Sequence, residues 1–224
     1  MTAAAPPPLL IAIDGPSAAG KGTLSRRLAA YYGLAHLDSG LLYRAVGARL
    51  LRAGRDAGDA EAAIAAARLV DFPELDGPEL REEPVAQAAS RVATIPGVRE
   101  ALLDLQRRFA HHPPGGFKGA ILDGRDIGTV VCPEAPIKLF ITASAAARAL
   151  RRHRELLRRG RESIYARVLQ DMTERDARDR GRAISPLIPA PDAIVIDSSD
   201  LDADAAFALA LDLIERRRGA SGGF

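Results

Sequence analysis

Short apolar runs alternate with longer amphipathic stretches along the chain. Runs of four to six residues rich in Leu, Ile, Val and Ala are typical of strands buried in a parallel sheet. Most of them lead into stretches whose apolar residues recur every three or four positions, which predicts helices on the sheet's faces. The pattern predicts five strands, at residues 9–14, 34–38, 120–123, 137–142 and 193–197.

The amphipathic stretches and the turn signals between them complete the expected chain path. Residues 71–84 are rich in proline and acidic side chains, so we expect a surface loop there, and Ser144 is a good helix N-cap. Strands separated by helices indicate an α/β fold, a parallel five-stranded sheet flanked by helices in one domain over residues 1–224. The helices are predicted at residues 21–32, 40–53, 59–70, 85–110 with an interruption at Pro96-Gly97, 144–160, 163–180 and 203–218.

A phosphate-binding pattern, G-x-x-x-x-G-K, follows the first predicted strand. Its backbone N–H groups and the helix N-terminus behind them can bind phosphate oxygens, while Lys21 can reach the β- and γ-phosphates. Gly22 stands where a magnesium-binding Ser or Thr is usual, so we expect phosphates and water to hold Mg²⁺, with Thr23 as a further candidate. The predicted ATP-binding residues are Gly15, Pro16, Ser17, Ala18, Ala19, Gly20, Lys21, Gly22 and Thr23.

Charged residues also follow the third predicted strand. Because the carboxyl ends of parallel strands meet at one edge of a sheet, we expect Asp123 beside the phosphate loop, where it can orient Mg²⁺ through water. Asp123 could instead cap the following turn. Arg125 and Asp126 would project into the same crevice, or could pair with each other.

Composition restricts the class of protein further. The net charge is only +2, aromatic residues make up 4%, and Tyr165 is the one aromatic residue in the arginine-rich segment, which argues against a nucleic-acid binder. Twelve arginines lie between Arg148 and Arg182. They are either a solvated helix face or a lid that closes over a triphosphate. On the second reading, Arg151, Arg175 and Arg182 join Lys21 in stabilising the charge of the transferred phosphoryl group.

Cellular context follows from what the pattern lacks. Cys132 is the only cysteine, so no intramolecular disulfide forms. The N-terminus has no basic region and no apolar run approaches the roughly 18 residues of a membrane span, so we expect no signal peptide, no membrane segment and a cytoplasmic location. Metal-ligand spacing is not seen among His36, His111, His112 and His153.

Four motif blocks, in this order and spacing, resemble bacterial cytidylate kinases. They are residues 13–23, the group Leu37-Asp38-Ser39-Gly40 with Tyr43-Arg44, residues 123–131, and residues 174–182. The first block alone is shared by many P-loop proteins, whereas the combination of the other three is specific. The resemblance implies a nucleoside monophosphate kinase, a monomer, with an acceptor-binding region over residues 39–110 and a lid over residues 148–165.

The resemblance also implies roles for individual residues. The acceptor monophosphate would be bound by Ser39, Arg44 and Arg125, next to Tyr43, with Arg182 beside the same phosphate. The cytosine would be read by Ser90, Arg99 and Asp126, and the sugar and phosphates would be served by Arg175 and Asp179. The implied reaction is transfer of the γ-phosphoryl group of ATP to CMP or dCMP, with Mg²⁺.

The chemistry of cytosine agrees with this implication. A carboxylate at Asp126 accepts from the N4 amino group, and Arg99 donates to N3 and O2, whereas uracil would set its O4 against the carboxylate. Other acceptors remain open, namely UMP, AMP or a non-nucleotide acid such as shikimate, as does a non-enzymatic nucleotide-binding regulator. Two departures from the family bear on this point: Ala18 replaces a common glycine, and residues 71–84 are too short for a β-rich insertion.

Overall fold

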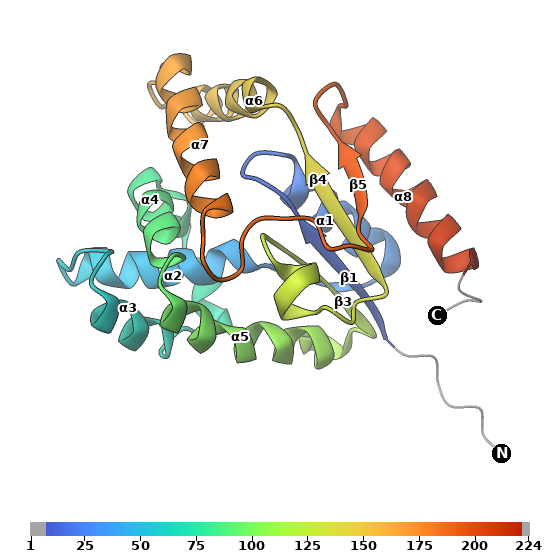
Figure 1. Cartoon of the computed structure of the whole chain (residues 1–224), viewed down its shortest axis with the longest axis horizontal. Coiled ribbons are helices and arrows are strands. Elements are labelled where there is room, and N and C mark those ends of the chain that lie inside the picture. The colour runs from blue at the N-terminus through green and yellow to red at the C-terminus, as the bar shows by residue number, and fades with distance from the viewer. Residues whose placement is uncertain (1–7, 221–224) are drawn as a thin grey trace.

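The computed structural model describes residues 8–220, which fold around one parallel sheet in the strand order β2-β3-β1-β4-β5. All four neighbouring pairs are parallel, so the five strands end at a common edge. Figure 1 shows β1 and β4 side by side in the middle of the molecule, with helices on both sides. The strands are β1 (Leu9–Asp14), β2 (Ala35–Asp38), β3 (Gly119–Gly124), β4 (Ile137–Thr142) and β5 (Ile194–Asp197). The predicted α/β fold is confirmed.

The sheet separates two apolar cores because successive side chains of a strand point to opposite faces. On β1, Leu10 and Ala12 belong to one core, whereas Ile11 and Ile13 belong to the other. The first core is completed by α2, α4 and α5, and the second by α1 and α8. Strands buried on both faces explain why their sequences are continuously apolar rather than alternating.

Helices cover both faces close to the predicted positions. The predicted interruption at Pro96-Gly97 is confirmed, because α5 begins at Pro96, and Ser144 caps α6 through a bond from the Ala147 N–H to its Oγ. The helix predicted over residues 59–70 ends early, at Ala67. The helices are α1 (Lys21–Tyr32), α2 (Ser39–Arg52), α3 (Ala60–Ala67), α4 (Glu83–Val92), α5 (Pro96–His111), α6 (Ala145–Arg158), α7 (Tyr165–Arg180) and α8 (Ala203–Ala220).

Residues 71–84 are more structured than the surface loop that the sequence predicts. They form two short 3₁₀ helices, Phe72–Asp76 and Pro78–Arg81, and then enter α4. Leu75 and Leu80 are buried in the core beside α2. The segment contains no strand, as expected. Its proline and acidic residues act as first-turn residues of tight helical turns, and its two leucines anchor it.

A further short helix of three residues, Pro114–Gly116, precedes β3, and a π-helical turn, Ile127–Val131, follows it. The π turn was not predicted, since its sequence reads equally well as a loop. Among residues 8–220, no helix is both long enough and apolar enough to cross a membrane. The expectation about the extreme N-terminus concerns residues outside the described part.

Candidate active site

The phosphate loop lies between β1 and α1 and has the backbone that its sequence predicts. Gly15 has φ +143°, and a Cβ there would lie 1.9 Å from the carbonyl oxygen of Ile141, so no other residue fits. Gly20 is the N-cap of α1 with φ 94°, and Ala18 has the left-handed φ of 58° that glycine favours. The loop therefore directs its N–H groups and the start of α1 to the carboxyl edge of the sheet.

Lys21 is buried at the base of this loop. Its Nζ donates to the carbonyl oxygen of Pro16 over 2.8 Å. Burial, with the nearby charge of Arg125, lowers the pKa of Lys21 to about 7. A negatively charged phosphate in the loop would reverse this penalty, so the site is built to gain charge complementarity when a phosphate binds.

Asp123, at the end of β3, lies beside this loop and is bonded to His36. The His36 Nε2 and Asp123 Oδ2 atoms are 2.7 Å apart. His36 is a half-buried residue of β2. Asp38 ends β2 in register with Asp123, and burial together with the charge of Asp123 raises the pKa of Asp38. Two carboxylates thus end neighbouring strands next to Lys21.

A small pocket beside the phosphate loop brings most of the predicted acceptor residues together. Its volume of about 50 Å³ is well below the roughly 300–1,000 Å³ of typical ligand pockets. In this conformation the pocket is narrow. Its predicted members are Ser39, Tyr43, Arg44, Arg99, Arg125, Asp126, Arg175 and Arg182, and the lining also includes Gly40, Ala89, Ala93 and Gly124.

Ion pairs bridge the walls of this pocket. Arg99 donates to Asp126 over 2.5 Å, with both side chains less than a tenth exposed, and its guanidinium lies 5.3 Å from the centre of the Tyr43 ring. Arg125 donates to Asp179 over 2.8 Å, so Arg125 and Asp126 do not pair with each other. Arg44, another lining residue, donates to the Leu80 carbonyl oxygen over 2.7 Å, which ties the short segment 71–84 to the pocket.

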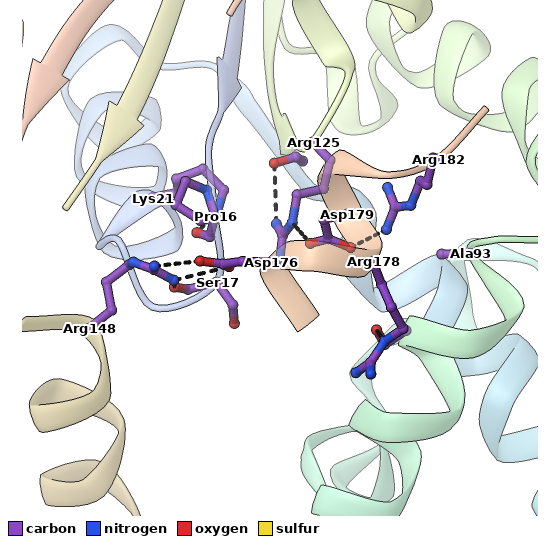
Figure 2. A network of polar contacts seen from close by, with 12 residues as sticks. Pro16, Ser17, Lys21, Ala93, Arg125, Arg148, Asp176, Arg178, Asp179 and Arg182 are labelled. Atoms are coloured by element: carbon purple, nitrogen blue, oxygen red, sulfur yellow. Dashed lines mark hydrogen bonds and ion pairs between the residues drawn. The ribbon is translucent and has the colours of Figure 1, made fainter. Parts of the chain in front are cut away.

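Asp179 organises the arginines rather than lining the pocket. It is almost fully buried on α7 and accepts from both Arg125 and Arg182, as Figure 2 shows. Burial raises its pKa, but the charges of Arg125, Arg182 and Arg175 outweigh burial and bring the pKa to about 2. Arg175 carries no such direct bond from its buried Nε, and burial, with the charge of Arg125, lowers its pKa to about 10.

Ser90 and Arg151, like Asp179, lie outside the pocket lining. Ser90 is buried on α4, and its Oγ accepts from Arg178 Nε over 3.3 Å. Arg151 donates to the carbonyl oxygens of Ser198 and Leu201 in the loop after β5. Their roles as base reader and catalytic arginine stay predictions, as does that of Thr23, which is exposed on α1.

Arg148, rather than Arg151, is the arginine of α6 that reaches the phosphate loop. Its guanidinium is 2% exposed and donates to both carboxylate oxygens of Asp176, over 3.1 and 2.5 Å, and to the Ser17 carbonyl oxygen over 3.3 Å. Figure 2 shows this link from α6 to α7 and the loop. Arg148 was not predicted, because nothing in the sequence separates it from the eleven other arginines of this segment.

Asp14 is a second residue that sequence reasoning did not place in the site. It ends β1, directly before the phosphate loop, and its carboxylate accepts from the N–H groups of Ile127 and Gly128. The available signal was an aspartate closing an otherwise apolar buried strand. Such a carboxylate must find donors inside the protein, and here the π turn provides them.

Comparisons with known proteins agree with this geometry. A family model described as cytidylate kinase matches residues 11–216. A cytidylate kinase of Paramagnetospirillum magneticum is 62% identical over 209 residues, 93% of this chain and 99% of that protein, and one of Xanthobacter autotrophicus is 57% identical over 210 residues, 94% and 99%. A crystal structure of an uncharacterized protein from Eubacterium ventriosum covers 92% of this chain and 98% of its own, with a TM-score of 0.52 and 15% identity, a likeness of fold alone. The motif blocks, the pocket and these matches lead to one conclusion: the chain belongs to the cytidylate kinase family.

Proposed function

We propose that this protein transfers the γ-phosphoryl group of ATP to CMP and dCMP, giving ADP and CDP or dCDP. The observation that carries the proposal is the pocket beside the phosphate loop. The pocket combines one buried carboxylate, Asp126, with five arginines. The pocket and the phosphate loop lie at the same edge of the sheet. The phosphates of donor and acceptor would therefore meet between Lys21 and Arg125. These two side chains are close enough for the charge of Arg125 to lower the pKa of Lys21.

Base selection is assigned to Asp126 and Arg99. In this structure these two groups form an ion pair with each other. Cytosine can replace that pairing, because its N4 amino group donates to the carboxylate while N3 and O2 accept from the guanidinium. Uracil offers an acceptor where cytosine offers a donor, which leaves a buried carboxylate oxygen unpaired. Desolvation of the pair makes this difference costly, so CMP is preferred over UMP.

The acceptor phosphate is assigned to the arginines on the other side of the pocket. Arg44, Arg125 and Arg182 line it, with Ser39 at the start of α2. The pKa values of Arg44 and Arg182 are lowered, chiefly by burial, which marks guanidinium groups that gain from an added anion. Asp179 holds Arg125 and Arg182 in place, and we assign the sugar and phosphates to it and to Arg175.

Phosphoryl transfer in this arrangement needs positioning and charge more than a general base, because the attacking atom is already a phosphate oxygen. Lys21 would bind the transferred group from the donor side, and Arg175 and Arg182 would neutralise it from the acceptor side. Residues 148–165 are proposed as the lid that excludes water, and residues 39–110 as the acceptor-binding region. In the lid, Arg152 is 2.5 Å from Glu83 at the start of α4, so the two regions are in contact.

Magnesium fits the donor chemistry of this edge. Asp38 and Asp123 supply carboxylate oxygens, the ligands that Mg²⁺ prefers. Within residues 8–220, no group of three or more acidic, histidine or cysteine side chains could hold a metal. We therefore propose that the nucleotide phosphates and water bind the ion, with Asp123 reaching it through water and Thr23 as a further candidate. The ion would supply positive charge to the β- and γ-phosphates.

We also propose that the protein is cytoplasmic, is a monomer and has no nucleic-acid partner. The small net charge of +2 and the scarcity of aromatic residues support the last point.

The reaction is tested by following ADP release from Mg-ATP in separate wells with CMP, dCMP, UMP, AMP, shikimate or no acceptor. We expect fast turnover with CMP and dCMP, slower turnover with UMP by about one to two orders of magnitude, and background rates elsewhere. Equal use of CMP and UMP would overturn the base-reading roles of Asp126 and Arg99. Background rates in every well would overturn the proposed reaction.

A further inference from the structure

The carboxylate of Asp14 is buried, and both of its oxygens accept hydrogen bonds from one turn. Its Oδ1 accepts from the Ile127 N–H over 2.8 Å and its Oδ2 from the Gly128 N–H over 2.7 Å. The side chain is 4% exposed. Both donors are backbone groups that directly follow Asp126, so Asp14 holds the start of the π turn 127–131.

Two further side chains hold the same turn from other elements. Arg107 of α5 donates from Nε to the Val131 carbonyl oxygen and from Nη2 to that of Val130, each over 3.1 Å. Lys138 of β4 packs against the turn, since a Cβ on Gly128 would lie 3.2 Å from its Cδ. The turn is thus held by β1, β4 and α5 at once.

The turn determines where Asp126 points. The Asp126 carbonyl oxygen accepts from the Val130 and Val131 N–H groups over 2.9 and 3.1 Å, so its backbone is part of the turn. Its own carboxylate reaches out to Arg99 in the pocket. A small rotation of the turn would move this carboxylate relative to a bound base, whose hydrogen bonds weaken steeply with distance and angle.

We propose that Asp14 is a positioning residue for base selection: by holding the turn 127–131 it fixes the Asp126 carboxylate in the orientation that distinguishes cytosine from uracil. This inference rests on the proposed role of Asp126. It also links the two substrate sites, because Asp14 is the last residue before Gly15 of the phosphate loop.

An isosteric substitution separates this role from packing. Asp14→Asn keeps the size of the side chain but replaces one acceptor with an NH₂ group, which would face a backbone N–H donor. The turn must then shift to relieve the clash of two donors. Arg107→Ala releases the other end of the same turn without touching the phosphate loop. Arg108→Ala, at the neighbouring exposed arginine of α5, is the matched control.

The experiment measures kcat/KM for CMP and for UMP with each variant and takes their ratio. We expect D14N to lower the ratio about tenfold and R107A to lower it about threefold, with R108A unchanged, because a misplaced carboxylate loses the donor of cytosine but not the already poor contact with uracil. A role confined to packing would lower stability and both rates together, and would leave the ratio as it is.

The D126N variant separates the base-reading role of Asp126 from the positioning role of Asp14. If D126N collapses the ratio while D14N and R107A both leave it at the wild-type value, the positioning role of Asp14 is overturned and the base reading stands. If D126N also leaves the ratio unchanged, base reading by Asp126 is overturned, and this inference with it. If D14N does not fold, the ratio of kcat/KM for CMP and UMP in R107A, compared with that in R108A, tests the same proposal.

Discussion

Two of the three lysines in this arginine-rich chain are buried and direct their ammonium groups at backbone carbonyl oxygens. Lys21 donates to Pro16 over 2.8 Å, and Lys138 donates to Pro133 over 2.6 Å and to both carboxylate oxygens of Asp192 over 2.9 Å. The three donors of a compact ammonium group can reach acceptors that do not lie in one plane, whereas the donors of a guanidinium all lie in its plane. At these positions the chemistry explains why the chain does not use arginine.

Binding of a nucleotide to Lys21 should take up a proton. The pKa of Lys21 is lowered to about 7, chiefly by burial, so at pH 8 the free protein holds this side chain mostly neutral. Phosphate oxygens favour the charged form and raise the pKa again, which draws up to about one proton per nucleotide from solution. Calorimetric titration with a non-hydrolysable ATP analogue and Mg²⁺, in buffers of different ionisation enthalpy, measures this uptake.

Lys21→Met is the control for that measurement, since it removes the titrating group and should abolish most of the proton uptake. The account of Lys21 is contradicted if the wild-type binding enthalpy does not depend on the buffer, or if Lys21→Met retains the full dependence.

Ala18 is a second residue whose backbone has a measurable consequence. Its φ of 58° lies in the left-handed region, which costs a residue with a Cβ about 1–2 kcal/mol. Ala18→Gly removes this strain and loses one half-buried methyl group, so we expect the free energy of unfolding in urea to rise by roughly 0.5 kcal/mol. The neighbouring Ala19→Gly should lower it by about 1 kcal/mol, because Ala19 is buried and has no positive φ. Equal losses in both variants would contradict the strain.

At the scale of elements, the hydrophobic pattern predicts the bounds of a strand or helix where glycine or proline also marks its ends. β1, α1 and β4 begin and end at the predicted residues, because an apolar run bounded by glycine or proline chemistry has few other solutions. The sequence predicts a loop at residues 71–84 because they are rich in proline and acidic side chains, and no helical periodicity opposes that prediction. Each short 3₁₀ helix buries a single leucine, Leu75 or Leu80, and one apolar residue produces no hydrophobic periodicity.

The candidate site was predictable where its residues belong to contiguous motifs, and less so where they meet through the fold. Eight of the predicted acceptor residues line one pocket. The bonds of Asp14 to the turn 127–131 and of Arg148 to Asp176 join residues more than 25 positions apart. His36 and Asp123 are likewise brought together only by the pairing of β2 with β3. Spacing along the sequence carries no information on such contacts.

The ion pair between Arg148 and Asp176 should be the strongest link between the helices α6 and α7. Both side chains are less than a tenth exposed, so removal of one partner leaves an uncompensated buried charge. Asp176→Ala should lower the free energy of unfolding by about 3–5 kcal/mol. The exposed pair of Arg216 and Asp212 on α8 is the comparison, and Arg216→Ala should cost under about 1 kcal/mol.

Replacement of both partners tests whether the cost is electrostatic. The double variant Arg148→Met with Asp176→Leu should recover most of the stability that Asp176→Ala loses, because no charge is then left unpaired. A double variant as unstable as the single one, or a single variant no worse than Arg216→Ala, would contradict this interpretation.

At the scale of the whole molecule, segments far apart in the sequence converge on one edge of the sheet. Arg152 and Arg161 from the α6–α7 region form ion pairs with Glu83 and Glu82 at the start of α4, and Arg178 of α7 donates to Ser90 of α4. Figure 1 shows α7 descending from α6 towards α2 and α4. An acceptor in that pocket would be surrounded by protein on most sides, as a reaction that must exclude water requires.

The measurement that tests the central claim most directly is label transfer from [γ-³²P]ATP in the presence of Mg²⁺ and CMP. The account predicts that the label appears in CDP in equal amount to the ADP released, and that with CMP omitted little inorganic phosphate is formed, because the transferred group is positioned for the acceptor rather than for water. Label that accumulates as inorganic phosphate at the same rate with and without CMP would contradict it, since the protein would then be a hydrolase rather than a kinase of CMP.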